Sequence, residues 1–283
     1  MISIKPISVL SEHYLQYQNL FDDVFGVQRK FQLDALEWLY ANNPLGTVVG
    51  FDAFENENLV AHYAAIPIEV MSDGKVERGL LSLNTATRKS HQGRGLFIKL
   101  AQATYQKAAA DGYSFVIGIA NHNSTPGFLN KLGFTLVDSL SAKIYAGSLK
   151  YNPNEFQGKD YFYRIWNANT LKWRIENPSN KLWYSSTMNH TSVLGDAFLG
   201  VLPVEALIGK VINNQIQNRK LFPKIKLFLG LVPDGHLKKI KSIDVPNFLR
   251  PSPLNFIYKD LMGQGRTLKR EKIFFTFLDF DAY

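Results

Sequence analysis

Apolar side chains in the first part of the chain recur at helical spacing. Between residues 13 and 43 they are three or four positions apart, which places them on one face of a helix; they are Tyr14, Tyr17, Leu20, Phe21 and Phe25. A second helix is predicted over Leu33–Ala41, and Asn42-Asn43-Pro44 ends it because proline cannot continue a helix. Two helical segments are therefore expected before the first strand.

The pattern then changes to apolar segments separated by polar turn residues, which is typical of β-strands. Strands are predicted over Thr47–Phe54, Leu59–Met71 and Val76–Arg88, with turns at residues 55–58 and 72–75. These three strands are expected to form a β meander.

Strands and helices alternate from there on. A helix is predicted over Leu96–Ala110, a short buried strand over Tyr113–Ala120 and a helix over Ser124–Leu132, and Gly133-Phe134 opens a final strand pair that runs through Tyr145. This order indicates an α/β (α+β) fold in which helices flank a mixed sheet.

The junction between the third strand and the next helix carries the sequence His91-Gln92-Gly93-Arg94-Gly95-Leu96. Gly93 and Gly95 remove side chains where the backbone must approach something closely. The free N–H groups of the following helix, together with the positive end of its dipole, point at the same place. Such a junction suits a phosphate or pyrophosphate group.

Composition limits the classes of protein that this chain can represent. Its 283 residues suffice for two domains, and 46% of them are hydrophobic, which supports a full core. The absence of cysteine excludes disulfides, thiolate metal sites and cysteine nucleophiles. No signal peptide and no apolar run of about 20 residues is visible, so a soluble, cytoplasmic protein without a membrane span is expected.

The net charge of +8 is unevenly distributed. Residues 1–150 carry 13 basic and 13 acidic residues, so the remaining 19 basic and 11 acidic residues of the chain lie in residues 151–283. A basic second half fits a small anionic acceptor, a membrane surface or a solvated basic face. Nucleic acid is not favoured, because neither a basic helix nor an aromatic stacking motif is present.

A weak internal repeat divides the chain. The segment from Leu36 to Pro44 resembles the segment from Leu171 to Pro178, and Pro67-Ile68-Glu69 resembles Pro203-Val204-Glu205. Similar segments at a nearly constant offset suggest two copies of one αβ unit. We therefore expect domains at residues 1–150 and 151–283 that meet near Lys150–Asp160, with a helix over Val204–Gln217 and a strand over Leu227–Val232.

Residues 35–145 resemble the GCN5-related N-acetyltransferase (GNAT) superfamily. The family's pyrophosphate signature, Arg/Gln-x-x-Gly-x-Gly/Ala, is matched at Gln92 and Gly95 but not at Phe97, where the family usually has a small residue. The segment from Leu129 to Phe134 resembles the family's Tyr-x-Lys-x-Gly-Phe ending. The repeat then suggests a tandem GNAT protein whose second half has diverged.

The resemblance implies a sheet whose central parallel strands splay apart and hold acetyl-CoA as co-substrate. Pantetheine would pair with the strand edge, and the glycine turn would bind the pyrophosphate. The cofactor-binding residues implied are Ala86, Thr87, Gln92, Gly93, Arg94, Gly95, Leu96, Phe97 and Asn121.

Catalysis in this family is direct attack of an amine on the thioester, usually with a tyrosine as the acid for the leaving thiolate. That position is Leu129 here, which cannot donate a proton. His122 and Ser124 are the candidates to replace it, beside protonation by solvent or departure of coenzyme A as a thiolate. On the acceptor side Asn84 is a polar residue in an apolar strand. His62 and Tyr63, which must face opposite sides of a strand, either line the acceptor pocket or belong to the core. No metal-binding constellation is visible.

The sequence is thus interpreted as an acetyl-CoA-dependent N-acetyltransferase acting on a primary amine of a small acceptor, such as an amino sugar on an anionic carrier. One alternative is a Fem-type aminoacyl transferase of cell-wall synthesis, which also pairs two GNAT-like units. Another is a non-catalytic acyl-CoA-binding protein, suggested by Leu129.

Overall fold

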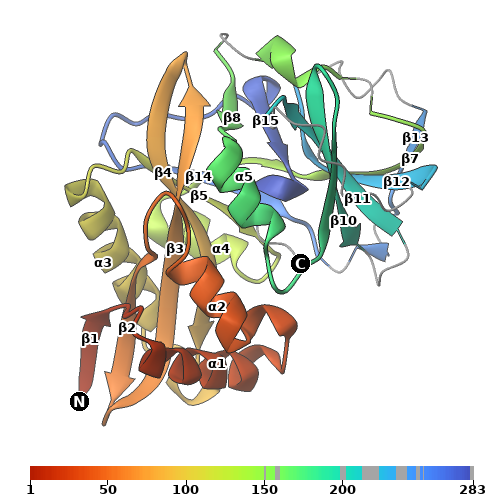
Figure 1. Ribbon diagram of the computed structural model, residues 1–283. Helices are drawn as coiled ribbons and strands as arrows, with labels where there is room; N and C mark the ends of the chain where they lie inside the picture. Colours follow the sequence, from red (N-terminus) through yellow and green to blue (C-terminus); the bar gives the residue numbers. More distant parts are fainter. Residues whose placement is uncertain are drawn as a thin grey trace. The chain divides into compact units, whose positions relative to one another are not determined.

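The chain divides into two compact units, and neither is continuous in the sequence (Figure 1). The first unit contains Met1–Ile68, Arg78–Leu136 and Ile257–Thr267, and the second contains Glu69–Glu77, Val137–Phe256 and Leu268–Tyr283. The structure is a computed structural model that describes residues 1–149, 151–156, 160–197, 202–211, 223–233, 241–246, 249–250 and 252–280. Lys150 and residues 157–159 of the expected domain boundary lie outside the described residues.

Both predicted N-terminal helices are confirmed, as α1 (Ser11–Phe25) and α2 (Leu33–Tyr40). The buried face of α1 consists of Tyr14, Tyr17, Leu20 and Phe21. Phe25, the fifth member of the predicted face, is exposed, although its ring stacks on Phe21 and Phe31. Helical spacing therefore identified the face correctly, except at the last turn.

The sheet of the first unit runs in the order β1-β2-β3-β4-β5-β14-β6. The predicted meander is confirmed as β2, β3 and β4, and the short strand that follows the long helix is β5. Strand β1, which pairs antiparallel with β2, was not predicted. The bounds are β1 Ile2–Pro6, β2 Val49–Glu55, β3 Asn58–Ser72, β4 Lys75–Thr87, β5 Phe115–Ala120, β6 Thr135–Ser139 and β14 Asn255–Asp260.

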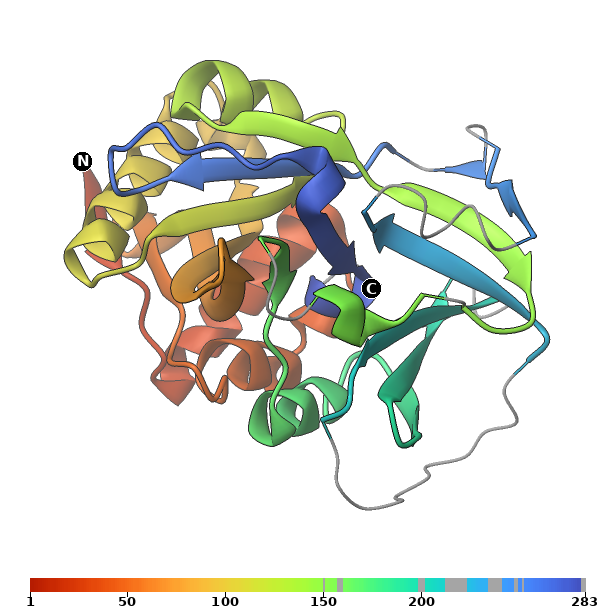
Figure 2. The ribbon, with the colours of Figure 1, turned by 90° about the horizontal axis from the view of Figure 1, so that it is seen from above.

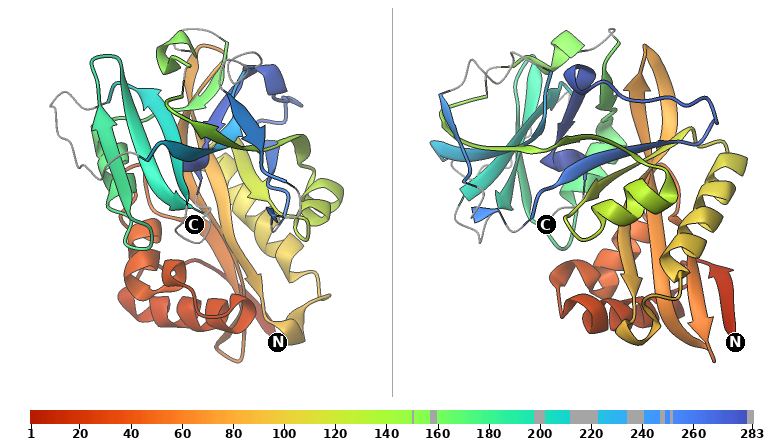
Figure 3. Two further views of the ribbon diagram at one scale, coloured as in Figure 1. Left: turned by 90° about the vertical axis from the view of Figure 1, so that its right-hand side faces the viewer. Right: turned by 180° about the vertical axis from the view of Figure 1, so that it is seen from behind.

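Helices cover both faces of this sheet (Figure 3). Neighbouring residues of a strand point to opposite faces of the sheet. The bonding partners of His62 and Tyr63 in β3 therefore identify the helices on each face. The imidazole of His62 is bonded to Tyr40 of α2, whereas the hydroxyl of Tyr63 is bonded to Tyr105 of α3. One face therefore carries α1 and α2, and the other carries α3 (Leu96–Ala110) with α4 (Thr125–Leu132).

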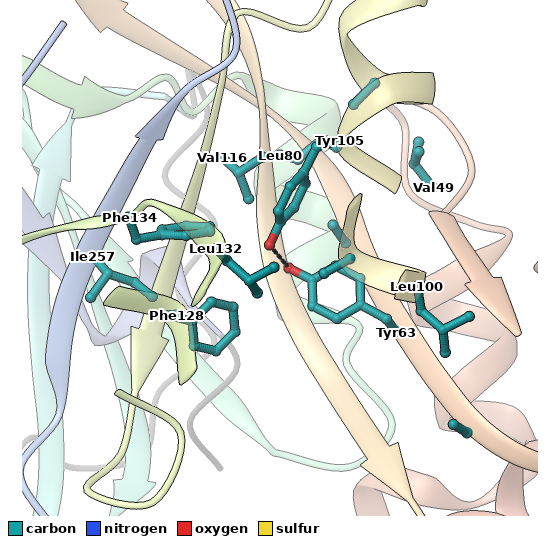
Figure 4. Packing of buried hydrophobic residues seen from close by; sticks show 14 of the residues in the cluster. Val49, Tyr63, Leu80, Leu100, Tyr105, Val116, Phe128, Leu132, Phe134 and Ile257 are labelled. Carbon is teal, nitrogen blue, oxygen red and sulfur yellow. Dashed lines mark hydrogen bonds between the residues drawn. The ribbon is translucent and has the colours of Figure 1, made fainter. Parts of the chain in front are cut away.

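The strand β14 completes the first unit from the far end of the chain. It lies between β5 and β6, as Figure 2 shows. Ile257 of β14 is fully buried in the same core cluster as Leu100, Val116 and Phe134 (Figure 4). The two strands expected after Gly133 are present as β6 and β7 (Ser141–Ala146), but the prediction that they pair with each other is wrong. Strand β6 pairs with β14, and β7 pairs with β12 and β13.

The second unit is mainly β-structure. Its helix α5 (Ala168–Ile175) begins at a capping box formed by Asn167 and Thr170. Strands β9, β10 and β11 are antiparallel neighbours, and β11 pairs in parallel with β12. The bounds are β8 Phe162–Arg164, β9 Leu182–Ser186, β10 His190–Ala197, β11 Leu202–Gly209, β12 Ile225–Leu231, β13 Ser242–Asp244 and β15 Ile273–Thr276.

One element of the second half was predicted wrongly and one correctly. The expected helix over Val204–Gln217 is replaced by strand β11 as far as Gly209, and residues 212–217 lie outside the described residues. The expected strand over Leu227–Val232 is confirmed as β12. That the second half is a diverged copy of the first stays a prediction. Within the described residues, no helix has the length and apolar character that crossing a membrane requires.

A protein truncated after residue 150 should fail to fold stably, because it lacks β14. The edge of β5 and the core space of Ile257 would then be exposed, and a side chain of that size contributes about 2–5 kcal/mol. Joining residues 252–268 to the truncated protein through a glycine–serine linker should restore a cooperative transition. Circular dichroism with thermal unfolding measures both proteins, and a cooperative transition without the added segment would contradict the expectation.

Candidate active site

Two central strands separate halfway along the sheet of the first unit. Strands β4 and β5 pair in parallel from Gly79 opposite Phe115 to Ser82 opposite Gly118. Both strands continue beyond this register, to Thr87 and Ala120. The predicted opening between the central strands is therefore present, and residues 83–87, including Ala86 and Thr87, form the edge of β4 that faces it.

Asn84 marks the point of separation. Its backbone is left-handed, with φ of 46°, which is uncommon for a residue with a side chain. Residues two positions apart in a strand normally share a face. Here the hydroxyl of Ser82 is bonded to Tyr63 at 2.8 Å, on the α3 face, whereas the amide of Asn84 donates to Tyr40 at 3.0 Å, on the α2 face. The left-handed residue thus turns its side chain across the sheet and interrupts the regular strand.

The glycine turn leads from the end of β4 to the start of α3. The side-chain amide of Gln92 donates to the carbonyl of Thr87 at 3.2 Å, which holds the turn against the strand. Gly93 and Gly95 have φ of 76° and 72°, and a Cβ atom on either would meet no protein atom within 4 Å. Space is therefore open in front of the first turn of α3, whose N–H groups have no acceptor within the helix.

Phe97, which departs from the family signature, is packed inward. Its ring meets Phe128 edge-on at 5.3 Å between centroids and lies 6.0 Å from the ring of Tyr63. A Cβ atom on Gly127 of α4 would come within 3.1 Å of this ring, so the glycine makes room for the phenylalanine. The ring is accommodated in the core, and the backbone N–H of Phe97 stays at the turn.

Arg94, predicted to support phosphate binding, has an acidic neighbour. Its guanidinium lies 3.8 Å from Glu55, and the same carboxylate is 3.0 Å from Nε2 of the buried His91. The hydrogen bond from His91 and the charge of Arg94 lower the pKa of Glu55. Glu55 therefore stays ionised at neutral pH and offsets part of the positive charge at the turn.

The predicted residues after β5 form a closed local turn. The side-chain oxygen of Asn121 accepts from the backbone N–H of Ser124 at 3.0 Å and from its hydroxyl at 3.1 Å. These bonds fix the start of α4. His122 lies in this turn with an exposed side chain. The structure thus brings Asn121, His122 and Ser124 together, and their chemical roles stay predictions.

Leu129 packs against the hydrophobic core beside Phe128 and Phe134. Helix α4 has the sequence Thr-Pro-Gly-Phe-Leu-Asn-Lys-Leu and offers no tyrosine. The family's usual acid is therefore absent from this helix.

A buried polar chain on the α1–α2 face was not found from the sequence. Nδ1 of His62 lies 2.6 Å from a carboxylate oxygen of Asp52, and Nε2 lies 2.9 Å from the hydroxyl of Tyr40. Tyr40 in turn accepts from Asn84. On the other side, the hydroxyl of Tyr17 donates to Asp52 at 3.1 Å. A carboxylate inside an apolar strand was the available signal, because a buried acid needs a partner.

Tyr17 and Tyr40, the two tyrosines in this row of buried hydrogen bonds, remain protonated at neutral pH. Burial raises the pKa of Tyr40 well above its ordinary value. Burial, followed by the charge of Asp52, also raises the pKa of Tyr17. Each phenol therefore acts as a hydrogen-bonding hydroxyl.

The opening, the glycine turn and the helix terminus together can hold an extended ligand with a pyrophosphate group. The open edge of β4 offers unpaired backbone groups to the part of the ligand that lies between the strands. Among the described residues, no group of three His, Asp or Glu side chains is arranged to hold a metal ion.

Comparison with known proteins agrees with this geometry. The acetyltransferase (GNAT) domain family model matches residues 5–137, and a search of curated proteins gave no match. A GCN5-related N-acetyltransferase from Anabaena variabilis ATCC 29413 superposes with a TM-score of 0.60 at 12% identity, over 92% of this chain and 73% of that chain.

A GCN5-related N-acetyltransferase from Kribbella flavida superposes with a TM-score of 0.63 at 8% identity, over 92% of this chain and 72% of that chain. At such identities the superpositions show the fold. The family model covers residues 5–137, and this part of the chain is therefore similar to the acetyltransferase (GNAT) domain.

Proposed function

We propose that this protein transfers the acetyl group of acetyl-CoA to a primary amine of a small acceptor. The observation that carries the proposal is the opening between β4 and β5, which leads directly to the glycine turn at the start of α3. A thioester with a long polar arm and a pyrophosphate carries groups that an open strand edge and a glycine turn can bind.

Backbone groups would bind most of the donor. The N–H groups of residues 93–97 would hold the pyrophosphate, and the absence of side chains at Gly93 and Gly95 leaves them accessible. The edge of β4 at Ala86 and Thr87 would pair with the pantetheine arm, and Asn121 would lie across the opening at the end of β5.

The reaction needs no covalent intermediate. The neutral amine attacks the thioester carbonyl carbon, a C–N bond forms, and the C–S bond breaks as coenzyme A leaves. The ammonium proton passes to water or a base, and the thiolate takes a proton from an acid. A backbone N–H on the open edge of β4 beside Asn84 would stabilise the developing oxyanion.

We assign the acid role to His122. Histidine is a common general acid in enzymes, and the side chain of His122 is exposed at the end of β5. Ser124 is the weaker candidate, because its hydroxyl already bonds to Asn121. Leu129 at the family's tyrosine position explains why the acid must differ here.

The acceptor is proposed to be an amine on an anionic carrier, for example a nucleotide-linked amino sugar. The support is the charge distribution, since residues 151–283 provide the entire excess of positive charge. In this proposal residues 1–150 bind the donor, and residues 151–283 shape the acceptor site.

Replacing Gly95 by alanine should weaken acetyl-CoA binding about 10- to 100-fold, because a Cβ atom would enter the space of the pyrophosphate and displace hydrogen bonds to a charged group. Gly112→Ala at the other end of α3 is the matched control. It also has a positive φ, of 83°, and open space around its Cβ position.

Both variants should lose about 1–2 kcal/mol of stability from the left-handed backbone, but Gly112→Ala should keep its affinity. Isothermal titration calorimetry with acetyl-CoA measures this and should give one site per chain. Equal affinities of the two variants, or no binding to the unmodified protein, would refute the proposed donor site.

Replacing His122 by glutamine should lower kcat about 100-fold with little change in the KM for acetyl-CoA, because only the protonation of the thiolate is lost. His13→Gln in α1, on the face of the sheet opposite α3 and α4, serves as a control and should retain full activity. A full rate in His122→Gln would mean that solvent protonates the leaving group.

Screening nucleotide-linked amino sugars, polyamines and free amino acids for release of coenzyme A thiol identifies the acceptor class. The proposal expects the anionic amino sugars to react fastest. Acetyl-CoA binding without turnover on any amine would indicate a non-catalytic acyl-CoA-binding protein.

A further inference from the structure

We infer that Asp52, His62 and Tyr40 form a hydrogen-bonded chain that holds Asn84 in its left-handed conformation and so positions the open edge of β4. The three residues are positioning residues that act through Asn84. The consequence for acyl transfer rests on the proposed function, whereas the consequence for the β4 backbone does not.

One assignment of the protons pairs every group in this row of hydrogen bonds. The amide of Asn84 donates to Tyr40, the hydroxyl of Tyr40 then donates to Nε2 of His62, and Nδ1–H of His62 donates to the carboxylate of Asp52. These hydrogen bonds connect β4, α2, β3 and β2 in turn. In this assignment each donor along the row faces an acceptor.

The chain lies out of reach of solvent. Asp52 and His62 are each 1% exposed, and Tyr40 is 0% exposed, whereas Asn84 is only half-buried. Asn84 is therefore the member of this hydrogen-bonded row that lies next to the opening between β4 and β5. The other end is anchored by Tyr17, which donates to the second oxygen of Asp52.

A proton-transfer role does not fit this arrangement. A proton entering from the opening would have to pass through the side-chain amide of Asn84, which is a poor acid and a poor base. Burial also keeps Tyr40 protonated. The chain therefore serves to hold a conformation.

That conformation needs support. A left-handed backbone is unfavourable for any residue with a Cβ atom, although asparagine adopts it more readily than most residues. The tertiary hydrogen bond from its side chain to Tyr40 of α2 restrains Asn84 in this conformation, next to the residues that face the donor. Without this hydrogen bond, β4 could return to the regular β conformation at Asn84, and the backbone N–H groups of residues 83–87 would move.

The opposite face of the sheet provides a matched control. Tyr105 of α3 bonds to the hydroxyl of Tyr63 at 2.7 Å (Figure 4). Tyr63 in turn bonds to the hydroxyl of Ser82 at 2.8 Å. Tyr105→Phe and Tyr40→Phe each delete one buried phenol hydroxyl from the first unit. Only Tyr40 is bonded to Asn84.

The first test is hydrogen–deuterium exchange on the full-length protein, followed in peptides that cover residues 83–87. Tyr40→Phe should accelerate exchange there about tenfold, and Tyr105→Phe should leave it unchanged, while thermal unfolding confirms that both variants are folded. Unchanged exchange in Tyr40→Phe, or equal acceleration in both variants, would overturn the inference.

The second test asks whether Tyr40 acts through Asn84. Glycine tolerates a positive φ without any restraint, so Asn84→Gly should keep more activity than Asn84→Ala. With the fastest amine of the acceptor screen, Tyr40→Phe should lower kcat about tenfold and leave the KM for acetyl-CoA within about threefold. In the Asn84→Gly background the same change should have no further effect, and additive losses would contradict the inference.

Asp52→Asn separates positioning from proton transfer. The asparagine oxygen can still accept from Nδ1–H of His62, so a positioning role predicts a loss of less than about threefold in kcat. A large loss would overturn the positioning role.

Calorimetry with coenzyme A on the unmodified protein tests the proposed function separately from the positioning of Asn84. Failure to bind would refute the proposed function, and the exchange experiment would still decide whether Asp52, His62 and Tyr40 hold Asn84.

Discussion

The hydrogen bond between Asp52 and His62 is the constraint on which the first unit depends. A carboxylate that is 1% exposed is strongly destabilising unless it is bonded on both oxygens. The two carboxylate oxygens of Asp52 are bonded to His62 and to Tyr17. The other ring nitrogen of His62 is buried as well and is bonded to Tyr40. These hydrogen bonds thereby connect α1 and α2 to β2 and β3.

The candidate site arises where two regular elements are interrupted. Continuous pairing between β4 and β5 would close the sheet and leave no backbone groups for a ligand. The left-handed Asn84 lies just after the last paired residue, Ser82, and the two glycines keep the first turn of α3 uncovered. Binding capacity thus comes from backbone geometry, which explains how the bulky Phe97 is tolerated once Gly127 makes room for its ring.

Local patterns predicted the first half of the chain well because the signal there is local. Helical spacing, turn residues and the glycine junction are each contained in a short segment, so α1 to α4 and β2 to β5 could be placed. The helix predicted over Val204–Gln217 was wrong at Val204–Gly209 for a physical reason. Both faces of β11 are buried, so its side chains do not alternate between apolar and polar, and a buried helix can show the same pattern. The partner of β6 could not be found locally, because β14 lies more than a hundred residues further along the chain.

The sequence alone determined the α/β character, the glycine turn and the acetyltransferase resemblance, because these depend on residue type and short spacing. The tertiary structure decided which side chains meet. A simple hairpin from Glu55 opposite Asn58 would place Asp52 opposite Ala61, but the register shifts between Ala53 and Phe54, so Asp52 lies opposite His62. One extra residue in a strand cannot be read from an apolar pattern, yet it creates the buried pair that connects α1 and α2 to Asn84.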